Sequence, residues 1–518
     1  MSPQPNEQPS WYQILPRLGT ADEFAAVREL FARSGFDYAS VCGRVGAEHL
    51  YLFTNKLETE YLERPVQDPL DALIRLFVVG RGIDNKDIAS QLGSVSIASL
   101  EALQLLVPRT GGSGWFAPVM AHPTPGGPIM ICDRNSSPDG VAMKRAPADA
   151  LYPALFANTI DFVERFPQTP CDNILEIGTG TGTAAIHWAG FAREVWATDI
   201  TPRAVHFAEF NTRLAGVGNV KVVQGDLYAP VEGMTFDRIA AHPPFVPAKN
   251  PAVVFRDGGE DGEQIAKRIV EGLPTYLRPG GTFWASFMIS DRTGESAEQR
   301  MRKWLGSSEA EFDIGIAIDM RRTAAESIAH AALHGVGTPE EICYFGDLWK
   351  ATQTEYLLHI SIVIRRHAAP RQGITVRTQA GTGFAARHLE WLLDWELARR
   401  DPNFTETFLE SRPTLAPVCE LRASHRLEGG AAISEDYTLE ADGPLRVACR
   451  VPGWSAKVLV GCDGRRTAGE IFNNLVDQGA IPKDADPREF VRMFSGLMAA
   501  GVLIAASEDL AKPQFSSL

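Results

Sequence analysis

The middle of this 518-residue chain is predicted to form a doubly wound α/β domain, with helix-rich segments on both sides. Short apolar strands and amphipathic helices alternate from about residue 147, which is typical of a parallel sheet covered on both faces. A glycine-rich turn follows the first strand, and an acidic residue ends each of the next two. Together these observations predict the fold class and place a ligand site at the strand ends.

The first segment, residues 1–143, is expected to be helical and to resemble a winged helix. Apolar residues recur at helical spacing in four stretches, and strand-like residues follow at Trp115–Met120 and Pro128–Cys132. The four stretches are 21–36, 68–80, 85–93 and 96–107. Such a unit binds DNA in some proteins and serves for docking or dimerisation in others. Few arginines or lysines fall on its third helix, which favours docking.

The second segment, residues 144–369, carries the alternation. Its strands are predicted at 173–178, 194–200, 219–226, 236–244 and 281–289, with helices at 183–192, 204–216 and 263–277. Two later strands, at 311–319 and 355–366, are predicted to pair as an antiparallel hairpin. The stretch between them is longer than a simple turn and is expected to lie near the mouth of the site.

The third segment, residues 370–518, is expected to be α+β and winged-helix-like at its end. It opens with a helix that contains Trp391 and Trp395, a spacing more typical of a core or interface than of a substrate platform. Helix, loop, helix and strand are predicted over 467–504. A homodimer formed through the terminal segments is compatible with this organisation.

Composition weighs against several classes of function. The chain has 50 basic and 64 acidic residues, a net charge of −14, which argues mildly against a nucleic-acid partner. Its seven cysteines are scattered and never spaced as CxxC, so a reducing cytoplasm is predicted, without a disulfide framework or structural zinc. The polar, proline-rich start is unlike a signal peptide, and no apolar run is long enough for a membrane span.

The strongest motif is the turn in Ile174–Gly182, with the sequence ILEIGTGTG. Gly178, Gly180 and Gly182 allow a sharp turn and a close backbone approach to a ligand. The dinucleotide fingerprint needs glycine at the sixth place, whereas here glycines alternate and Glu176 stands two places ahead. That pattern suits a ligand with a cationic amino acid end, although a loop without a ligand is the alternative.

Two further acids follow the next strands. Asp199, with Ile200 after it, is placed where a carboxylate can accept hydrogen bonds from both ribose hydroxyls. Asp226, followed by Leu227, is placed where it can meet an adenine amino group. Either acid alone could be a helix cap or a loop residue. Three acids at three successive strand ends favour a nucleoside-containing ligand.

The fourth strand ends in AHPPFVP, and here residues 144–290 resemble methyltransferases that carry an (Asn/Asp)-Pro-Pro-(Phe/Tyr) motif. Within that group they most resemble the protein-glutamine methyltransferases of release factors and the guanine N-methyltransferases of ribosomal RNA. Four motifs occur in the family's order. They are Lys144–Leu151, the glycine turn, the His-Pro-Pro-Phe motif and Arg256–Gly262.

The resemblance implies a Rossmann-like class I methyltransferase core with S-adenosylmethionine as cofactor and S-adenosylhomocysteine as product. It assigns cofactor binding to the glycine turn, to the strand-end acids with their neighbours, and to a residue before the first strand. These residues are Arg145, Glu176, Gly178, Thr179, Gly180, Gly182, Asp199, Ile200, Asp226, Leu227 and His242. It assigns the acceptor side to His242, Pro243, Pro244 and Phe245.

His242 stands where the family has Asn or Asp, whose oxygen holds a planar amine toward the methyl group. A neutral imidazole accepts one hydrogen bond and can act as a base, but it does not mimic a carboxamide. We therefore expect a small-molecule or peptide acceptor that His242 orients or deprotonates. Methylation of protein glutamine or ribosomal RNA, and a cofactor-sensing transcriptional regulator, are the alternatives. The remaining alternative is that His242 only packs at the strand end and has no role in catalysis.

His330 and His334 are four residues apart on a predicted helix, which is a spacing that metal ligands use. No acidic or cysteine partner is expected beside them, so packing is favoured and no metal site is predicted.

Overall fold

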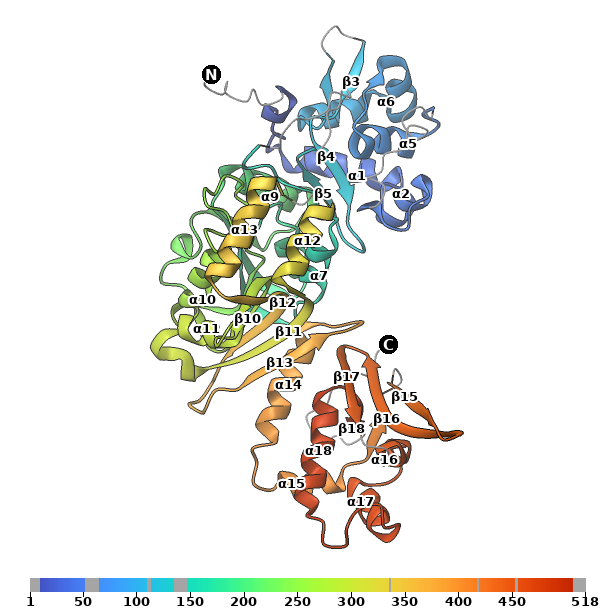
Figure 1. The fold of residues 1–518 in the computed structure, drawn as a ribbon. Coiled ribbons are helices and arrows are strands. Elements are labelled where there is room, and N and C mark those ends of the chain that lie inside the picture. Colours follow the sequence, from blue (N-terminus) through green and yellow to red (C-terminus); the bar gives the residue numbers. More distant parts are fainter. Residues whose placement is uncertain are drawn as a thin grey trace. The chain divides into compact units, whose positions relative to one another are not determined.

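The computed structural model describes residues 10–51, 65–109, 113–134, 147–334, 337–416, 419–451 and 455–505 (Figure 1). The chain forms two compact units. The first comprises 1–164 and 168–278, and the second comprises 165–167 and 279–518. This grouping differs from the three expected segments, whose boundaries were placed after residues 143 and 369.

The first unit begins with short helices and a small sheet. Its helical elements are η1 (Ser10–Gln13), α1 (Ala21–Arg33), α2 (Tyr38–Val45), α5 (Pro69–Leu73), η2 (Ile74–Val79) and α6 (Asn85–Ala102). The strands β1 (Ile83–Asp84), β2 (Val107–Pro108) and β3 (Gly114–Phe116) form an antiparallel sheet in the order β1-β3-β2. Gly93, at φ 75°, divides α6 into two helical halves. The two halves correspond to the two short helices predicted at 85–93 and 96–107.

A hairpin of β4 (Met120–Pro123) and β5 (Ile129–Cys132) joins this segment to α9 (Pro202–Ala215). The buried Asn211 side chain of α9 accepts from the Ile131 N–H at 2.9 Å and donates to the Ile131 carbonyl at 2.9 Å. Phe24 and Phe210 pack edge to face, with ring centroids 5.0 Å apart. The helical segment and α9 therefore share one hydrophobic core, which explains why no unit boundary falls near residue 143.

The predicted alternation appears as four parallel strands in the order β8-β7-β6-β9. The strands are β6 (Cys171–Ile177), β7 (Ala192–Asp199), β8 (Val220–Gln224) and β9 (Phe236–Ala241). Helices α7 (Ala157–Glu164), α8 (Thr183–Trp188), α9 and α10 (Gln264–Tyr276) accompany them, with the short η3 (Ala229–Val231). The fold class predicted for this part of the chain is confirmed, and all four strands end at one edge.

The second unit contains β10 (Leu277–Arg292) from residue 279 onward, β11 (Phe312–Thr323) and β12 (Thr354–Arg366), with α11 (Ala297–Trp304) and η4 (Gly306–Glu311). β12 runs antiparallel between β10 and β11, which confirms the predicted hairpin. Four strands continue this sheet beyond β11. They are β13 (Thr375–Ala380), β17 (Leu445–Val451), β16 (Ala431–Asp442) and β15 (Cys419–Glu428). Because β13 pairs with β11, the expected boundary after residue 369 does not separate two compact units.

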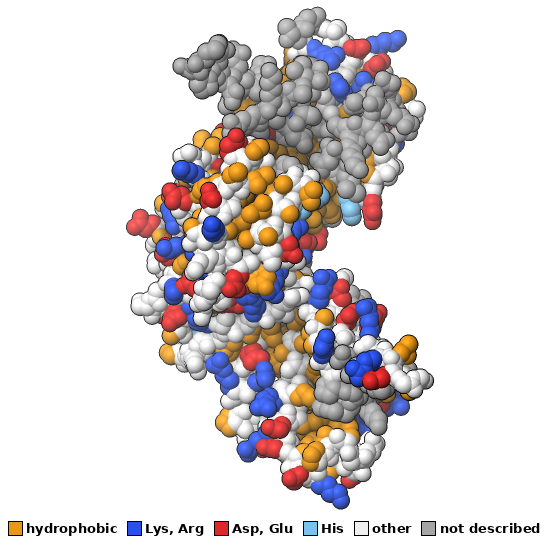
Figure 2. Space-filling view, in the orientation of Figure 1, with side chains coloured by type: hydrophobic (Ala, Val, Ile, Leu, Met, Phe, Trp, Pro, Cys, Tyr) orange, Lys and Arg blue, Asp and Glu red, His pale blue; other side chains and the backbone are white. Residues whose placement is uncertain are grey.

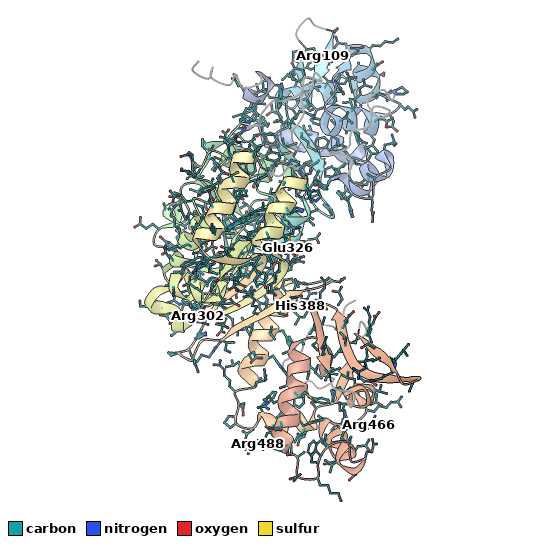
Figure 3. The ribbon with its side chains drawn as sticks, in the orientation of Figure 1. Arg109, Arg302, Glu326, His388, Arg466 and Arg488 are labelled. Atoms are coloured by element: carbon teal, nitrogen blue, oxygen red, sulfur yellow. The ribbon has the colours of Figure 1, made fainter. Side chains whose placement is uncertain are left out.

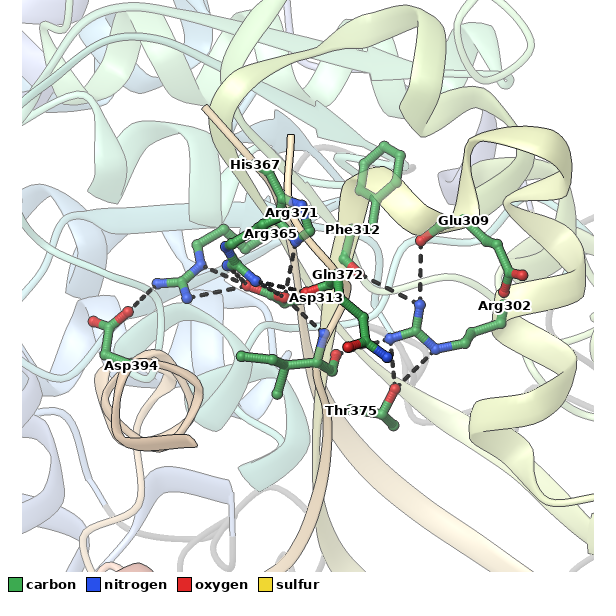
Figure 4. A network of polar contacts seen from close by, with 11 residues as sticks. Arg302, Glu309, Phe312, Asp313, Arg365, His367, Arg371, Gln372, Thr375 and Asp394 are labelled. Carbon is green, nitrogen blue, oxygen red and sulfur yellow. Dashed lines mark hydrogen bonds and ion pairs between the residues drawn. The ribbon is translucent and has the colours of Figure 1, made fainter. Parts of the chain in front are cut away.

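A buried carboxylate ties the chain after β12 to the sheet (Figure 4). Asp313 accepts hydrogen bonds from Arg365, from Arg371 at 2.8 Å, from His367 at 2.9 Å and from the Ile374 N–H at 2.9 Å. Burial alone would raise the pKa of Asp313, but the bonds from Arg371, His367 and Ile374 lower it to about 2. The cluster fixes the segment that leads into β13.

The expected insertion is a helical hairpin of α12 (Ala324–His334) and α13 (Pro339–Ala351). Figure 2 shows hydrophobic side chains gathered over these two helices, and Leu333 is 81 % exposed. The rings of His330 and His334 lie 4.4 Å apart, centroid to centroid. Among the described residues, no group of metal-ligating side chains is large enough to hold an ion.

The rest of the second unit is mostly helical. Its elements are α14 (Ala386–Ala398), α15 (Phe404–Glu410), β14 (Pro413–Leu415), α16 (Ser455–Gly461), α17 (Ala468–Asp477), α18 (Pro487–Ala499) and β18 (Leu503–Ala505). β14 and β18 pair antiparallel. Trp391 and Trp395 are buried, and Trp395 donates its indole N–H to the Ser495 carbonyl at 3.1 Å, so both serve the core. Burial lowers the pKa of His388, labelled in Figure 3, to about 4. No helix among the described residues is long and apolar enough to cross a membrane.

Candidate active site

The glycine turn connects β6 to α8. Gly178 and Gly180 adopt positive φ values of 77° and 56°, and a side chain built on either would meet nothing within 4 Å. The turn therefore borders open space, as a ligand cradle requires. The N–H groups of Gly178 and Thr179 both donate to the Thr198 carbonyl of β7, at 2.8 and 3.0 Å, and hold the start of the turn.

Glu176 lies beneath this turn and is 4 % exposed. One of its oxygens accepts the Thr179 hydroxyl at 2.6 Å and the Ala185 N–H at 3.1 Å. Burial raises the pKa of Glu176 to about 8 against these two bonds, and the charge of Asp199 adds to the rise. Among the described residues, the two hydrogen bonds to its carboxylate come from neutral donors, so a cationic group placed near it would be stabilised.

Asp199 ends β7 beside the turn. Its Oδ2 accepts the Gly180 N–H at 3.0 Å, and its Oδ1 accepts the N–H and hydroxyl of Thr201 at 2.9 and 3.1 Å. Burial raises the pKa of Asp199 against these bonds. Ile200 follows, 52 % exposed, and offers an apolar surface to a flat ring. The carboxylate thus links the glycine turn to the N-terminus of α9.

Asp226 and Leu227 follow β8. The half-exposed Asp226 carboxylate pairs with Arg268 of α10 at 2.7 Å. Leu227 has a φ of 51°, a left-handed conformation that costs energy for a residue with a Cβ. Such backbone strain is concentrated at ligand sites and switch regions, which agrees with the predicted role of this pair.

The acceptor motif begins where β9 ends. The imidazole of His242 stacks on Phe162 of α7, with ring centroids 5.4 Å apart and planes 21° apart. The Phe245 ring lies 6.3 Å from the imidazole on a tilted plane. Pro243 and Pro244 stand between them and fix the backbone direction. His242 is therefore held by aromatic packing in addition to its place in the chain.

The glycine-rich segment Arg256–Gly262 lies backbone to backbone against this motif. A side chain on Gly258 would come within 2.6 Å of the Pro244 carbonyl oxygen, and one on Gly262 within 2.5 Å of the Phe245 carbonyl oxygen. The Gly258 N–H donates to the Val246 carbonyl at 2.9 Å. Glycine is required here because only glycine allows this approach, and the segment supports the acceptor loop.

The first unit thus holds every described residue that the sequence assigned to the site. Arg145 lies outside the described residues. Asp149, from the same motif, accepts a hydrogen bond from the Tyr12 hydroxyl at 3.0 Å. Sequence reasoning missed Thr201, although Thr-Pro before a helix is a capping signal that could have indicated it. No local signal could have indicated Phe162, since its contact with His242 spans distant elements.

Comparison with known proteins gives consistent matches. A family model described as methyltransferase small domain matches residues 157–310. A release factor glutamine methyltransferase of Moorella thermoacetica is 35 % identical over 128 residues, which are 22 % of this chain and 45 % of that protein. A candidate protein N5-glutamine methyltransferase of Methanocaldococcus jannaschii is 32 % identical over 175 residues, 32 % of this chain and 85 % of that protein.

The chain spans about half the length of the release factor glutamine methyltransferases it matches, 45 % and 55 % in two of them. A solved ribosomal protein L11 methylase of Lactobacillus delbrueckii subsp. bulgaricus shares 19 % identity over 40 % of this chain and 74 % of its own, at a TM-score of 0.23. The Rossmann-like fold of this region follows from its strand order and from the family match.

Proposed function

This chain belongs to the S-adenosylmethionine-dependent methyltransferases that carry the methyltransferase small domain, and we propose that it methylates a side-chain nitrogen of a protein or peptide. Its cofactor is S-adenosylmethionine. When bound, the cofactor supplies a methyl group activated by a sulfonium, so that alignment of the acceptor contributes most to the rate.

The residues of the turn fit this cofactor. Gly178 and Gly180 leave open space beside the backbone, where the amino acid end would lie. The ammonium group of the cofactor would stabilise the Glu176 carboxylate, and Asp199 would accept hydrogen bonds from the ribose hydroxyls. The exposed Ile200 would lie against the adenine ring, and Asp226 would meet its amino group. The chain's own contribution is to bind and orient the cofactor.

The acceptor loop carries the proposal for the substrate. Pro243, Pro244 and Phe245 retain the family's motif, and the relatives just described are named as glutamine methyltransferases. A carboxamide nitrogen bears two hydrogens, so it needs two acceptors. One ring nitrogen of His242 and one main-chain carbonyl of the loop would provide them. The expected small-molecule acceptor is supported less well, because no relative described above is named for one.

His242 nonetheless favours a second candidate, an acceptor that needs a base, such as a hydroxyl or thiol of a small molecule. Two substitutions separate the candidates. An amide acceptor needs only a hydrogen-bond acceptor at this position, so His242→Asn would keep methylation and His242→Ala would lower it. If the imidazole is a base, both variants would lose activity.

The experiment uses radiolabelled S-adenosylmethionine and a bacterial peptide chain release factor as the acceptor. We expect kcat to fall about tenfold or more in His242→Ala and to stay within about threefold of wild type in His242→Asn. Affinity for S-adenosylhomocysteine, measured by calorimetry, should be unchanged in both. An Asn variant as inactive as the Ala variant would contradict the amide proposal and favour the base.

The winged-helix interpretation of the ends is also a proposal. At the N-terminal end it is supported by β1, the two halves of α6 and the antiparallel order β1-β3-β2. The second half of α6 carries Glu101 but no arginine or lysine, and Val95 on it is 78 % exposed, so we favour a protein partner over nucleic acid. Salt-sensitive, specific binding to genomic DNA fragments in a gel shift would favour the regulator alternative instead.

The proposed cytoplasmic location is supported by the seven cysteines, all of which are free thiols.

A further inference from the structure

The N-terminal η1 packs onto the segment that precedes β6. Trp11 and Tyr12 are buried there against Ala150, with Phe116 beside them. Tyr12 is only 3 % exposed although it lies near the start of the chain. Burial raises the pKa of its phenol, so the hydroxyl is a neutral donor, and it donates to Asp149 Oδ1 at 3.0 Å.

An arginine of the cofactor domain lies directly under the Tyr12 ring. The Arg203 guanidinium carbon is 3.7 Å from the ring centroid, and one Nη donates to the Tyr12 carbonyl at 3.0 Å. The same guanidinium makes a two-point contact with Asp133, at 2.5 and 2.8 Å. Asp133 in turn accepts the Leu151 N–H at 2.9 Å. We call Tyr12, Asp133, Asp149 and Arg203 the clasp.

The clasp is one helical turn from the proposed ribose site. Arg203 is in the first turn of α9, whose N-cap is Thr201. Thr201 donates both its N–H and its hydroxyl to Asp199 Oδ1. The backbone from Asp199 to Arg203 is therefore fixed at one end by the strand and at the other by the clasp. Because the side chains of Arg203 and Asp133 are 10 % and 5 % exposed, the ion pair between them is desolvated and rigid.

We propose that Tyr12 is a positioning residue for the cofactor, which acts through Arg203 to hold Asp199 in place for the ribose hydroxyls. The N-terminal segment would thereby complete a site whose described contacting residues, from Glu176 to Asp226, lie more than about 160 residues further along the chain. This inference depends on the cofactor assignment and is independent of the acceptor's identity.

Removal of the ring would admit water to the ion pair and release Asp149, so that the first turn of α9 is held less rigidly. In calorimetric titrations of the full chain with S-adenosylhomocysteine, we expect Tyr12→Ala to raise Kd about fivefold or more. Tyr12→Phe keeps the ring over Arg203 and should have a smaller effect. Arg203→Lys loses the two-point contact and should weaken binding as Tyr12→Ala does, which provides a second variant if Tyr12→Ala does not fold.

A double-mutant cycle separates positioning from general stabilisation. In an Asp199→Asn background, Tyr12→Ala should change Kd by less than about twofold, because its effect passes through Asp199. Tyr38→Ala, which truncates a half-buried tyrosine of α2 in the same unit, is the matched control and should leave Kd unchanged.

Three outcomes would overturn the inference: an unchanged Kd in both Tyr12→Ala and Arg203→Lys, the same fold-loss with and without Asp199, or an equal loss in the Tyr38 control. If the wild-type chain itself failed to bind S-adenosylhomocysteine, the cofactor assignment would fall, and the proposed positioning role with it.

Discussion

Two buried carboxylates, one in each compact unit, show how differently this protein treats the same chemical group. Glu176 and Asp313 both lie on strands, and burial alone would raise the pKa of both carboxyl groups. The pKa of Glu176 is about 8, whereas that of Asp313 is about 2. The difference comes from their partners. Asp313 is surrounded by Arg365, Arg371 and His367, whereas the bonds shown to Glu176 come from a hydroxyl and a backbone N–H.

Asp313 thus serves the fold, whereas Glu176 has the surroundings expected of the cofactor-binding acid that we propose. A carboxylate whose charge is already balanced by cationic side chains contributes to stability, and it gains little further stabilisation from a cationic ligand. A buried carboxyl group without a cationic partner is held mostly neutral near pH 7 and gains from any cation that arrives. Five predictions test this contrast, in order of expected effect.

Asp313→Ala should have the largest effect, on stability. The variant leaves the cationic side chains of the cluster without their shared partner, and we expect the free energy of unfolding to fall by about 3–5 kcal/mol in urea titrations. Asp394→Ala is the control, because Asp394 is an outer, half-exposed partner of Arg365 and its loss should cost less than about 1 kcal/mol. An Asp313 variant as stable as this control would show that the cluster is not structural.

Asp199→Ala should weaken cofactor binding without comparable loss of stability. The ribose hydroxyls lose their acceptor and the Gly180 N–H loses its partner, so we expect Kd for S-adenosylhomocysteine to rise about tenfold or more. Calorimetry measures this directly. Asp172→Ala, an exposed acid of the same unit, should leave the affinity unchanged. Unchanged affinity in the Asp199 variant would remove the ribose assignment.

Glu176→Gln should abolish a proton release that accompanies binding. In the free protein the pKa of Glu176 is about 8, above its ordinary 4.5, so near pH 7 the group is mostly protonated. A bound cation favours the carboxylate, lowers the pKa and expels close to one proton. Calorimetry in two buffers with different ionisation enthalpies reports the release. The same release in the Gln variant would assign the proton to another group.

The raised pKa of Glu176 and the lowered pKa of Asp313 make stability depend on pH in opposite directions. The pKa of Glu176 is raised on folding, so its contribution is present at acidic pH and is lost as pH rises through 8. The pKa of Asp313 is lowered from 3.8, so its contribution, about 2 kcal/mol, is present above pH 4 and is lost as pH falls through 2. In acid unfolding measurements, the Asp313→Ala variant should therefore lack the loss of stability that wild type shows as pH falls from 4 to 2.

Arg268→Ala should have the smallest effect. Arg268 and Asp226 form a half-exposed pair, so the free energy of unfolding should change by less than about 0.5 kcal/mol. Affinity for S-adenosylhomocysteine should stay within about twofold, since Asp226 keeps its place at the end of β8. A large loss of affinity would make Arg268 a part of the binding site.

Much of the proposed cofactor site could be predicted because its signals are local in the sequence. The strand that ends in Glu176, the glycine turn and the acids Asp199 and Asp226 follow from periodicity and from residue types with fixed conformational preferences. The motif from His242 to Phe245 was also read from the sequence, as was the antiparallel pairing of the last two predicted strands.

The tertiary structure decided what depends on contacts between distant parts of the chain. Tyr12 meets Asp149 and Arg203 across 137 and 191 residues, and no spacing in the sequence indicates such a contact. The stacking of Phe162 on His242 is likewise a contact between distant parts of the chain. The division into two units does not follow the boundary expected after residue 369, because β13 pairs with β11 across that position. Local sequence signals predicted which residues bind the cofactor, whereas only the tertiary structure showed which distant residues hold them in place.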